Sequence, residues 1–130
     1  MRLAHCSCRQ LTVVTNGEPR KVSVCHCRAC QHRTGSAFGV AVFYEADQVT
    51  ASGEYQTYMR PGDSGKSLEF RFCPACGSTV YWMPEFRPNL VAIALGCFED
   101  SSAMEPTQSV YEETRHAWVS RSFRDPGERR

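Results

Sequence analysis

Seven of the eight cysteines in this 130-residue sequence fall into three short groups, and their spacing is typical of metal ligands. Soft thiolates at tetrahedral spacing favour Zn²⁺, and a single iron ion or an iron–sulfur cluster is the less favoured alternative. Disulfides are disfavoured, because cysteines one or two residues apart rarely reach disulfide geometry without strain. The three groups are Cys6-Ser7-Cys8, Cys25-His26-Cys27-Arg28-Ala29-Cys30 and Cys73-Pro74-Ala75-Cys76-Gly77.

The local spacings indicate how each group could present its sulfur atoms. In a strand, residues i and i+2 project to the same face, so each Cys-x-Cys pair is expected to place two sulfurs together. A Cys-x-x-Cys turn also brings two sulfurs onto one ion, and Gly77 tolerates the left-handed backbone that such a turn needs. The sequence therefore predicts metal binding by pairs that come from distant parts of the chain.

The number of clustered cysteines divides naturally into four and three. A closed structural zinc site takes four protein ligands, whereas a catalytic site commonly takes three plus water or substrate. Two distant pairs would form the closed site, and the triple Cys25, Cys27 and Cys30 would form the open one. In the alternative, Cys97 or a histidine fills a fourth position on the triple and makes it a second structural site. Cys97 ends an apolar strand, which is more typical of a small buried residue than of a ligand.

Residues beside the cysteines could assist the metal or simply surround it. His26 lies between two candidate ligands and would point away from them in a strand, so a structural role is favoured over proton transfer. His32 follows the triple and could line the site, although a surface position is favoured. The nearby basic residues are expected to screen thiolate charge, with substrate binding as the alternative; they are Arg9, Lys21, Arg28, Arg33 and Arg71.

The elements that must position these ligands are mostly strands. Helical periodicity is weak, and the best helical candidate is a single turn after Cys27. Residues 60–66 resemble a hairpin loop. Tyr81, Trp82, Phe86 and Trp118 are expected to pack in the core or on a sheet, with a pocket wall as the alternative. The expected strands are Gln10 to Thr15, Lys21 to Cys25, Phe38 to Tyr44, Tyr55 to Met59, Ser67 to Phe72, Thr79 to Met83 and Leu90 to Leu95, with edges at Gln108 to Tyr111 and Ala117 to Val119.

Charge and hydropathy exclude several classes of protein. With 15 basic and 14 acidic residues, the chain is not expected to bind nucleic acid or a membrane surface. No run of roughly 18 apolar residues is present, which argues against a membrane-spanning helix. Residues 1–6 contain no apolar stretch after the basic residue, so no signal peptide is expected and a cytoplasmic location is predicted. Stable disulfides are rare in that reducing compartment, which again favours metal.

Large aliphatic residues and phenylalanine are few for a chain of this length. Small domains with thin cores are commonly held together by metal ions or disulfides. We therefore expect one mostly β, zinc-stapled domain over residues 1–119. Residues 120–130, which carry four arginines, are expected to form a basic, mobile tail.

The cysteine motifs resemble those of a known family. The most specific block runs from Cys25 to Phe38, CHCRACQHRTGSAF, and it is supported by the first Cys-x-Cys pair, by Phe72 to Gly77 and by Arg115 to Trp118. Together these motifs resemble the glutathione-dependent formaldehyde-activating enzymes and their relatives, which include centromere protein V. The resemblance extends from Cys6 to about Trp118.

This resemblance implies a β-tent fold of antiparallel sheets with two zinc ions per chain. It also implies carbon–sulfur lyase activity, which joins or splits formaldehyde and glutathione as S-hydroxymethylglutathione, so that the expected partner is a small-molecule thiol or thiol adduct. The alternative is a non-catalytic zinc-binding domain with two structural sites that mediates partner binding. The implied ligands are Cys6, Cys8, Cys73 and Cys76 for the structural zinc, and Cys25, Cys27 and Cys30 for the second, catalytic-type zinc.

Overall fold

The computed structural model describes residues 1–62, 65–84 and 87–120 as a mostly β fold. Within these ranges, no helix is long and apolar enough to cross a membrane. Phe86, part of the loop at 60–66 and the expected tail from 121 onward lie outside the described residues. The strands are β1 (Arg2–His5), β2 (Thr12–Thr15), β3 (Lys21–Cys25), β4 (Gly39–Glu45), β5 (Val49–Ser52), β6 (Gln56–Pro61), β7 (Ser67–Phe72), β8 (Thr79–Pro84), β9 (Leu90–Ala94) and β10 (Gln108–Val110). The helices are α1 (Arg28–Thr34) and the short 3-10 turns η1 (Ala46–Gln48), η2 (Leu95–Cys97) and η3 (Glu112–Thr114).

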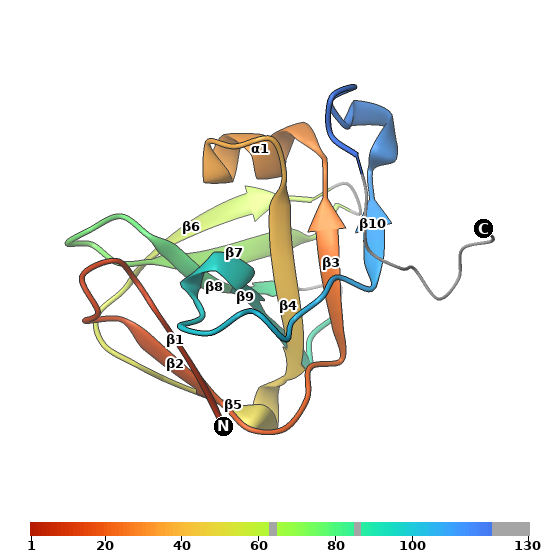
Figure 1. Ribbon diagram of the computed structural model, residues 1–130. Coiled ribbons are helices and arrows are strands. Elements are labelled where there is room, and N and C mark those ends of the chain that lie inside the picture. Colours follow the sequence, from red (N-terminus) through yellow and green to blue (C-terminus); the bar gives the residue numbers. More distant parts are fainter. Residues whose placement is uncertain (63–64, 85–86, 121–130) are drawn as a thin grey trace.

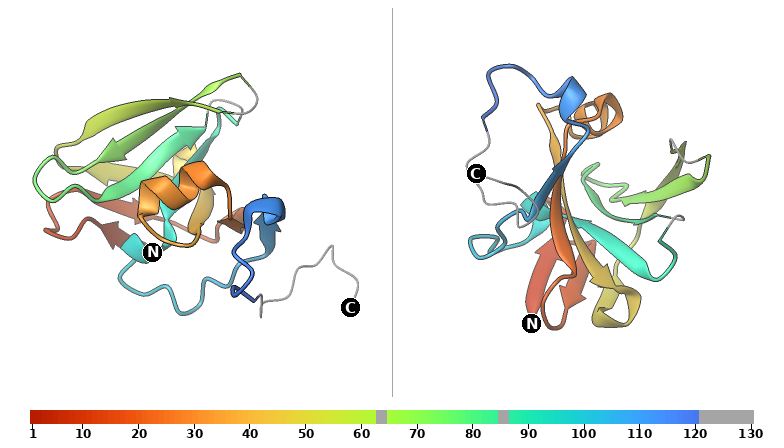
Figure 2. Two further views of the ribbon diagram at one scale, coloured as in Figure 1. Left: turned by 90° about the horizontal axis from the view of Figure 1, so that it is seen from above. Right: turned by 90° about the vertical axis from the view of Figure 1, so that its right-hand side faces the viewer.

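The strands form two sheets, which are shown in Figures 1 and 2. A three-stranded antiparallel sheet has the order β1-β2-β5, and a seven-stranded sheet has the order β10-β3-β4-β9-β8-β7-β6. In Figure 1, β6 and β7 run crosswise to β3 and β4, which reflects the strong twist of the larger sheet. Helix α1 connects the end of β3 to the start of β4, and the short edge strand β10 pairs with β3. The helix and β10 are therefore both attached to β3.

The mostly β fold predicted from the sequence is confirmed, and each main expected strand has a counterpart. Three details differ. Strands β1 and β5 were not expected, because only one of their eight residues, Ala4, is buried, and pairing with β2 holds them instead of an apolar pattern of their own. The edge expected at Ala117 to Val119 is wrong: the backbone N–H of Val119 donates to the carbonyl of His116 at 3.0 Å and closes a turn. Strand β10 pairs with β3 in parallel, which is the exception to the expected antiparallel pairing among the described strands.

Helix α1 is longer than the single turn expected after Cys27. Cys27 is its N-cap residue, and its Sγ accepts a hydrogen bond from the backbone N–H of Cys30 at 3.3 Å. Gly35 ends the helix in the left-handed conformation, with φ of 62°, and donates its N–H to the carbonyl of Gln31. The helix therefore begins on one candidate ligand and holds another in its first turn.

Alternation along the central strands divides the apolar side chains between two faces of the larger sheet. Tyr81 and Ile93 belong to the main core, together with Leu11 from the chain near the small sheet. Their neighbours Trp82 and Ala92 belong to a second apolar cluster. Since adjacent residues of a strand point to opposite faces, the larger sheet has the core on one side and a separate apolar surface on the other.

Gly53 allows the chain after β5 to pass directly against the backbone of Gln10. Its φ is +105°, and a Cβ at this position would lie 2.1 Å from the carbonyl oxygen of Gln10. The side chain of Gln10 is fixed there, because its Nε2 donates to the carbonyl of Glu54 at 2.7 Å and its Oε1 accepts from the N–H of Glu54 at 2.9 Å. Only glycine permits this close approach.

We expect Gly53→Ala to lower the free energy of unfolding by about 2–6 kcal/mol, because the strained φ and the backbone clash each cost about 1–3 kcal/mol. Gly65→Ala is the matched control: Gly65 also has a positive φ, of +82°, but no atom lies within 4 Å of the added Cβ. Its expected loss is about 1 kcal/mol. Denaturant unfolding followed by circular dichroism measures both variants, and equal losses would contradict the steric argument.

Candidate metal centres

Four cysteines from two different sheets meet at one point, and we call them the first cluster. Cys6 and Cys8 lie in the connection between β1 and β2, whereas Cys73 and Cys76 lie in the connection between β7 and β8. Their four Sγ atoms all lie within 4.8 Å of one another. The Sγ of Cys8 is 3.6 Å from that of Cys6 and 3.7 Å from that of Cys73. The first cluster therefore joins the small sheet to the large one.

Hydrogen bonds to sulfur support the first cluster from within its own turns. The backbone N–H of Leu11 donates to the Sγ of Cys6 at 3.3 Å. The Sγ of Cys73 accepts from the side chain of Gln10 at 3.0 Å and from the backbone N–H of Ala75 at 3.4 Å. Hydrogen bonds from Ser78 lower the pKa of Cys76 to about 5. The hydrogen bonds to Cys73 and Cys76 lower the pKa of both residues and so favour their thiolate form, which is the form that binds metal.

The sulfur pairs meet for a reason other than the one expected from the sequence. Cys6 and Cys8 lie in a turn, in which the N–H of Arg9 donates to the carbonyl of Cys6 at 3.1 Å, and not in a strand. Cys27 is a helix cap and not a strand residue. Strand alternation is therefore the wrong explanation for both Cys-x-Cys pairs. Gly77 does adopt the expected left-handed backbone, with φ of 81°.

The second cluster consists of Cys25, Cys27 and Cys30. Cys25 is the last residue of β3, Cys27 caps α1, and Cys30 lies in the first turn of the helix. Their Sγ atoms also lie within 4.8 Å of one another, and those of Cys25 and Cys27 are 3.4 Å apart. All three residues are half-buried. The structure thus assembles the triple at the junction between a strand and a helix.

In the metal-free second cluster, Cys30 is the thiol whose pKa is lowered, so it carries the negative charge. A hydrogen bond from the thiol of Cys25 is the main cause that lowers the pKa of Cys30 to about 5, and the positive charges of Arg33 and Arg60 act in the same direction. The same hydrogen bond, together with burial, raises the pKa of Cys25. Thiolates bind metal ions, so a bound cation would replace the protons that these sulfurs otherwise share.

Within the described part of the chain, no fourth Cys, His, Asp or Glu joins the second cluster. Cys97 lies outside both clusters, packs against the main core and directs its Sγ at the carbonyl of Thr79, 3.6 Å away. His32 is exposed and does not line the cleft described below. A second structural site closed by either residue, the alternative left open by the sequence, therefore has no geometric support.

A cleft of about 670 Å³ opens beside the second cluster. One wall is the second apolar cluster of the large sheet, including Phe70 and Trp82. The opposite wall contains residues of β10 and η3, including Val110 and Thr114. All three thiols of the second cluster line this cleft. Of the aromatic residues considered in the sequence analysis, Trp82 lines the pocket wall. Tyr81 packs in the core, and Trp118 is 75% exposed.

The cleft has an excess of positive charge. Of its described lining residues, four are cationic, and Glu113 is the acidic one. The guanidinium of Arg33 lies 4.4 Å from the ring centroid of Trp82, and that of Arg60 lies 4.8 Å from the centroid of Phe70. The four cations are Lys21, Arg28, Arg33 and Arg60. Arg60, which lies 30 residues from the nearest cysteine of the triple in sequence, was missed by reasoning from local motifs.

The other basic residues near the cysteines have different roles. Arg9 forms an ion pair with Glu99 at 2.8 Å. Arg71 pairs with Glu69 at 2.8 Å and lies over the ring of Tyr55. Neither lines the cleft.

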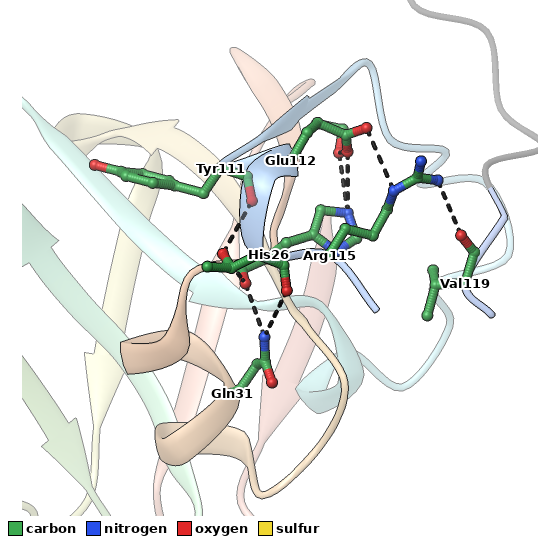
Figure 3. A network of polar contacts seen from close by, with 8 residues as sticks. His26, Gln31, Tyr111, Glu112, Arg115 and Val119 are labelled. Atoms are coloured by element: carbon green, nitrogen blue, oxygen red, sulfur yellow. Dashed lines mark hydrogen bonds and ion pairs between the residues drawn. The ribbon is translucent and has the colours of Figure 1, made fainter. Parts of the chain in front are cut away.

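His26 is buried, and its ring faces the carboxylate of Glu112 (Figure 3). Its Nε2 lies 3.1 Å from the hydroxyl of Ser109 and 3.3 Å from the carboxylate of Glu112. Its backbone carbonyl accepts hydrogen bonds from the side chains of Gln31, at 2.9 Å, and Thr114, at 2.8 Å. Gln31 lies on α1 within the Cys25 to Phe38 block, whereas Ser109, Glu112 and Thr114 lie in residues 109–114, which no sequence motif singled out.

Comparison with known proteins identifies a family and similar solved structures. The family model described as glutathione-dependent formaldehyde-activating enzyme matches residues 1–114. A crystal structure of a Rhodobacter sphaeroides protein, solved as a structural-genomics target, is similar with a TM-score of 0.62 and 12% identity, over 83% of this chain and 99% of that chain. At that identity the likeness concerns the fold alone. No significant match was found among curated proteins.

We expect Cys30 to be the first thiol of the second cluster to react with iodoacetamide in the metal-free protein at about pH 6.5. Thiolate is the nucleophile, and the lowered pKa of Cys30 keeps it ionised above about pH 5. Cys25 should react more slowly because its pKa is raised, and so should Cys97, in which burial raises the pKa to about 11.

Peptide mapping by mass spectrometry after a short pulse of reagent measures the order of labelling. Circular dichroism, recorded before the pulse, controls for loss of strand structure after metal removal. Equal labelling of Cys25 and Cys30 in a folded sample would show that the charge is not localised on Cys30.

Proposed function

The chain belongs to the glutathione-dependent formaldehyde-activating enzyme family, and from that premise we propose that it is a zinc-dependent carbon–sulfur lyase. Its proposed substrates are small thiol–aldehyde adducts such as S-hydroxymethylglutathione. The observation that carries the proposal is the second cluster: three thiols, one fewer than a closed tetrahedral site needs, that line a cationic cleft. A reducing compartment such as the cytoplasm would keep these thiols available for metal.

We propose that the two clusters hold one zinc ion each. Both donor sets consist of sulfur alone, which suits zinc, and their spacing is short enough for one ion to contact every member. In this proposal Cys6, Cys8, Cys73 and Cys76 hold a structural ion that joins the two sheets. Cys25, Cys27 and Cys30 hold the ion at which substrate binds. That second zinc would supply Lewis-acid polarisation and a template for a thiol and an aldehyde.

The reaction itself is an addition across a carbonyl group. In the forward direction the thiol sulfur forms a bond to the aldehyde carbon, the carbonyl π bond breaks, and the thiol proton ends on oxygen. The reverse direction returns the proton to sulfur and releases the aldehyde. Neither direction needs an oxidant or a reductant, so positioning and charge stabilisation are the contributions required of the protein.

The charge of the cleft favours an anionic thiol. Glutathione carries two carboxylates and one ammonium group, and it can place carboxylates against Arg33, Arg60 or Lys21 while its sulfur approaches the second cluster. Stacking on Trp82 and Phe70 limits the positions open to the two guanidinium groups. Neither guanidinium forms an ion pair with a carboxylate of the described residues. Arg33 forms a hydrogen bond with Cys30, so Arg60 is the residue proposed to meet the carboxylate of a ligand first.

Metal analysis of cysteine variants tests the division of roles. Wild-type protein is expected to contain two zinc ions per chain. Cys73→Ser should lose one ion and more than about 3 kcal/mol of stability, because a structural metal contributes folding free energy directly. Cys30→Ser should also lose one ion but keep the cooperative unfolding of the wild type, and Cys97→Ser should keep both ions. If Cys30→Ser is as unstable as Cys73→Ser, the second site is structural and the catalytic role loses its basis.

Turnover measurements test the proposed reaction and its charge preference. Zinc-loaded protein should accelerate exchange between formaldehyde, glutathione and their adduct, which NMR exchange spectroscopy measures. Arg60→Gln should raise KM for glutathione by about 10–100-fold, since a hydrogen bond to a charged group contributes about 1.5–3 kcal/mol, while leaving KM for neutral 2-mercaptoethanol unchanged.

The matched control for Arg60→Gln is Arg20→Gln. Arg20 is an exposed arginine that pairs with Glu45 outside the cleft, so its loss should leave both KM values unchanged. Absence of acceleration with any thiol at full zinc loading would overturn the lyase proposal and favour a non-catalytic zinc-binding domain.

A further inference from the structure

Gln31 is a buried amide whose hydrogen-bonding capacity is fully used. It is 5% exposed and directly follows Cys30 in α1. Its Nε2 donates to the carbonyl of His26 at 2.9 Å and to that of Thr114 at 3.3 Å. Its Oε1 accepts from Arg28 at 2.6 Å and lies 2.9 Å from Nε2 of His116. A glutamine side chain offers two donors and one acceptor oxygen with two lone pairs, so each of these positions is occupied.

One of these bonds closes the loop that carries the second cluster. The carbonyl of His26 belongs to the peptide bond between His26 and Cys27. The side-chain amide that binds it is that of Gln31, the residue after Cys30. The bond from Gln31 to His26 therefore fixes the start of the loop against its end. Within the described residues the side chain of Gln31 donates to two carbonyls and to no sulfur atom, whereas the amide of Gln10 donates directly to Cys73 in the first cluster.

The C-terminal segment, residues 108–116, also binds the backbone of His26, and its residues Tyr111, Glu112 and Arg115 lie around His26 in Figure 3. The hydroxyl of Thr114 donates to His26 at 2.8 Å, alongside the amide of Gln31. The N–H of His26 donates to the carbonyl of Val110 at 3.1 Å, and Val110 lies opposite Cys25 in the parallel pairing of β10 with β3. Both backbone groups of His26 are thus held by a segment more than 80 residues away in sequence.

We propose that Gln31 and Thr114 are positioning residues for the second metal site, so that the C-terminal segment is a working part of that site. By fixing the peptide between Cys25 and Cys27, they hold the three thiolates at the separation that one ion requires. This inference rests on the second zinc site proposed above. Outer-sphere groups that orient metal ligands commonly contribute about 10–100-fold to metal affinity.

The test compares two near-isosteric substitutions in the full-length protein. Gln31→Met removes both amide donors and preserves side-chain length and helix propensity, and Thr114→Val removes the hydroxyl alone. Gln48→Met is the matched control, because the amide of Gln48 also donates to two backbone carbonyls, those of Asn16 and Glu18, but belongs to η1 and does not bind the loop of the second cluster. Zinc affinities are measured by competition with a chromophoric chelator, under reducing conditions.

We expect Gln31→Met to weaken one of the two zinc ions by about 10–100-fold and to leave the other unchanged, with a smaller loss in Thr114→Val and none in Gln48→Met. In a Cys30→Ser background, which lacks the second site, Gln31→Met should have no effect on the remaining ion. Replacing zinc by Co²⁺ gives a second measure, since the absorption bands of the affected site should shift in Gln31→Met at saturating metal.

Wild-type affinity for both ions in Gln31→Met and Thr114→Val would overturn the positioning role. So would an equal loss in Gln48→Met, or a loss at the first site in the Cys30→Ser background, because either result indicates general destabilisation. Should Gln31→Met fail to fold, Thr114→Val decides by the same criteria. A wild-type protein that binds only one zinc ion would instead overturn the second metal site itself, so the two failures are distinguishable.

Discussion

Four sulfur atoms within 4.8 Å of one another cannot all carry negative charge unless a cation lies between them. The two sheets of this fold meet at that point. Cys6 and Cys8 belong to the turn between β1 and β2 of the small sheet, and Cys73 and Cys76 belong to the turn between β7 and β8 of the large one. Residues next to this point pack closely: Gly53 lies against the backbone of Gln10, and the side chain of Gln10 donates to the sulfur of Cys73. A structural zinc at this point, as proposed above, would join the two sheets and so reduce the number of large apolar residues that the core needs.

The large sheet performs two tasks because adjacent residues of its strands face opposite ways. Tyr81 packs in the main core while Trp82, the next residue, forms the wall of the cleft. Stacked over this wall are the guanidinium groups of Arg33 and Arg60, which enter from α1 and β6. The candidate metal ligands of the second cluster lie at the end of a strand and at the start of a helix. The strand centres supply the apolar surface of the cleft beside them.

The sequence indicates those features of the site that are encoded locally. The short spacings within each cysteine group, and the left-handed turn at Gly77, follow from rules that span only a few residues. The two Cys-x-Cys pairs form through a turn and a helix cap, and not through strand alternation. The Cys-x-Cys spacing alone does not distinguish these three local structures. Arg60 and Thr114 could not be recognised, because each acquires its role from a partner far away in the chain. The grouping of the four cysteines of the first cluster came from family resemblance, since spacing leaves the partition of distant pairs open.

The two clusters differ in how their ligands are held, and this difference bears on what each can do. In the first cluster the donors to sulfur lie mostly within the turns that supply the ligands, such as the N–H of Leu11 to Cys6. In the second cluster Cys27 and Cys30 are similarly local, but the peptide next to Cys25 is held by groups from the C-terminal segment. A site supported by distant contacts can change its geometry without dismantling the core, because those contacts lie at the sheet edge formed by β10. In the proposed function, exchange of a ligand at the second zinc would use that freedom, whereas a structural zinc between the two sheets would not need it.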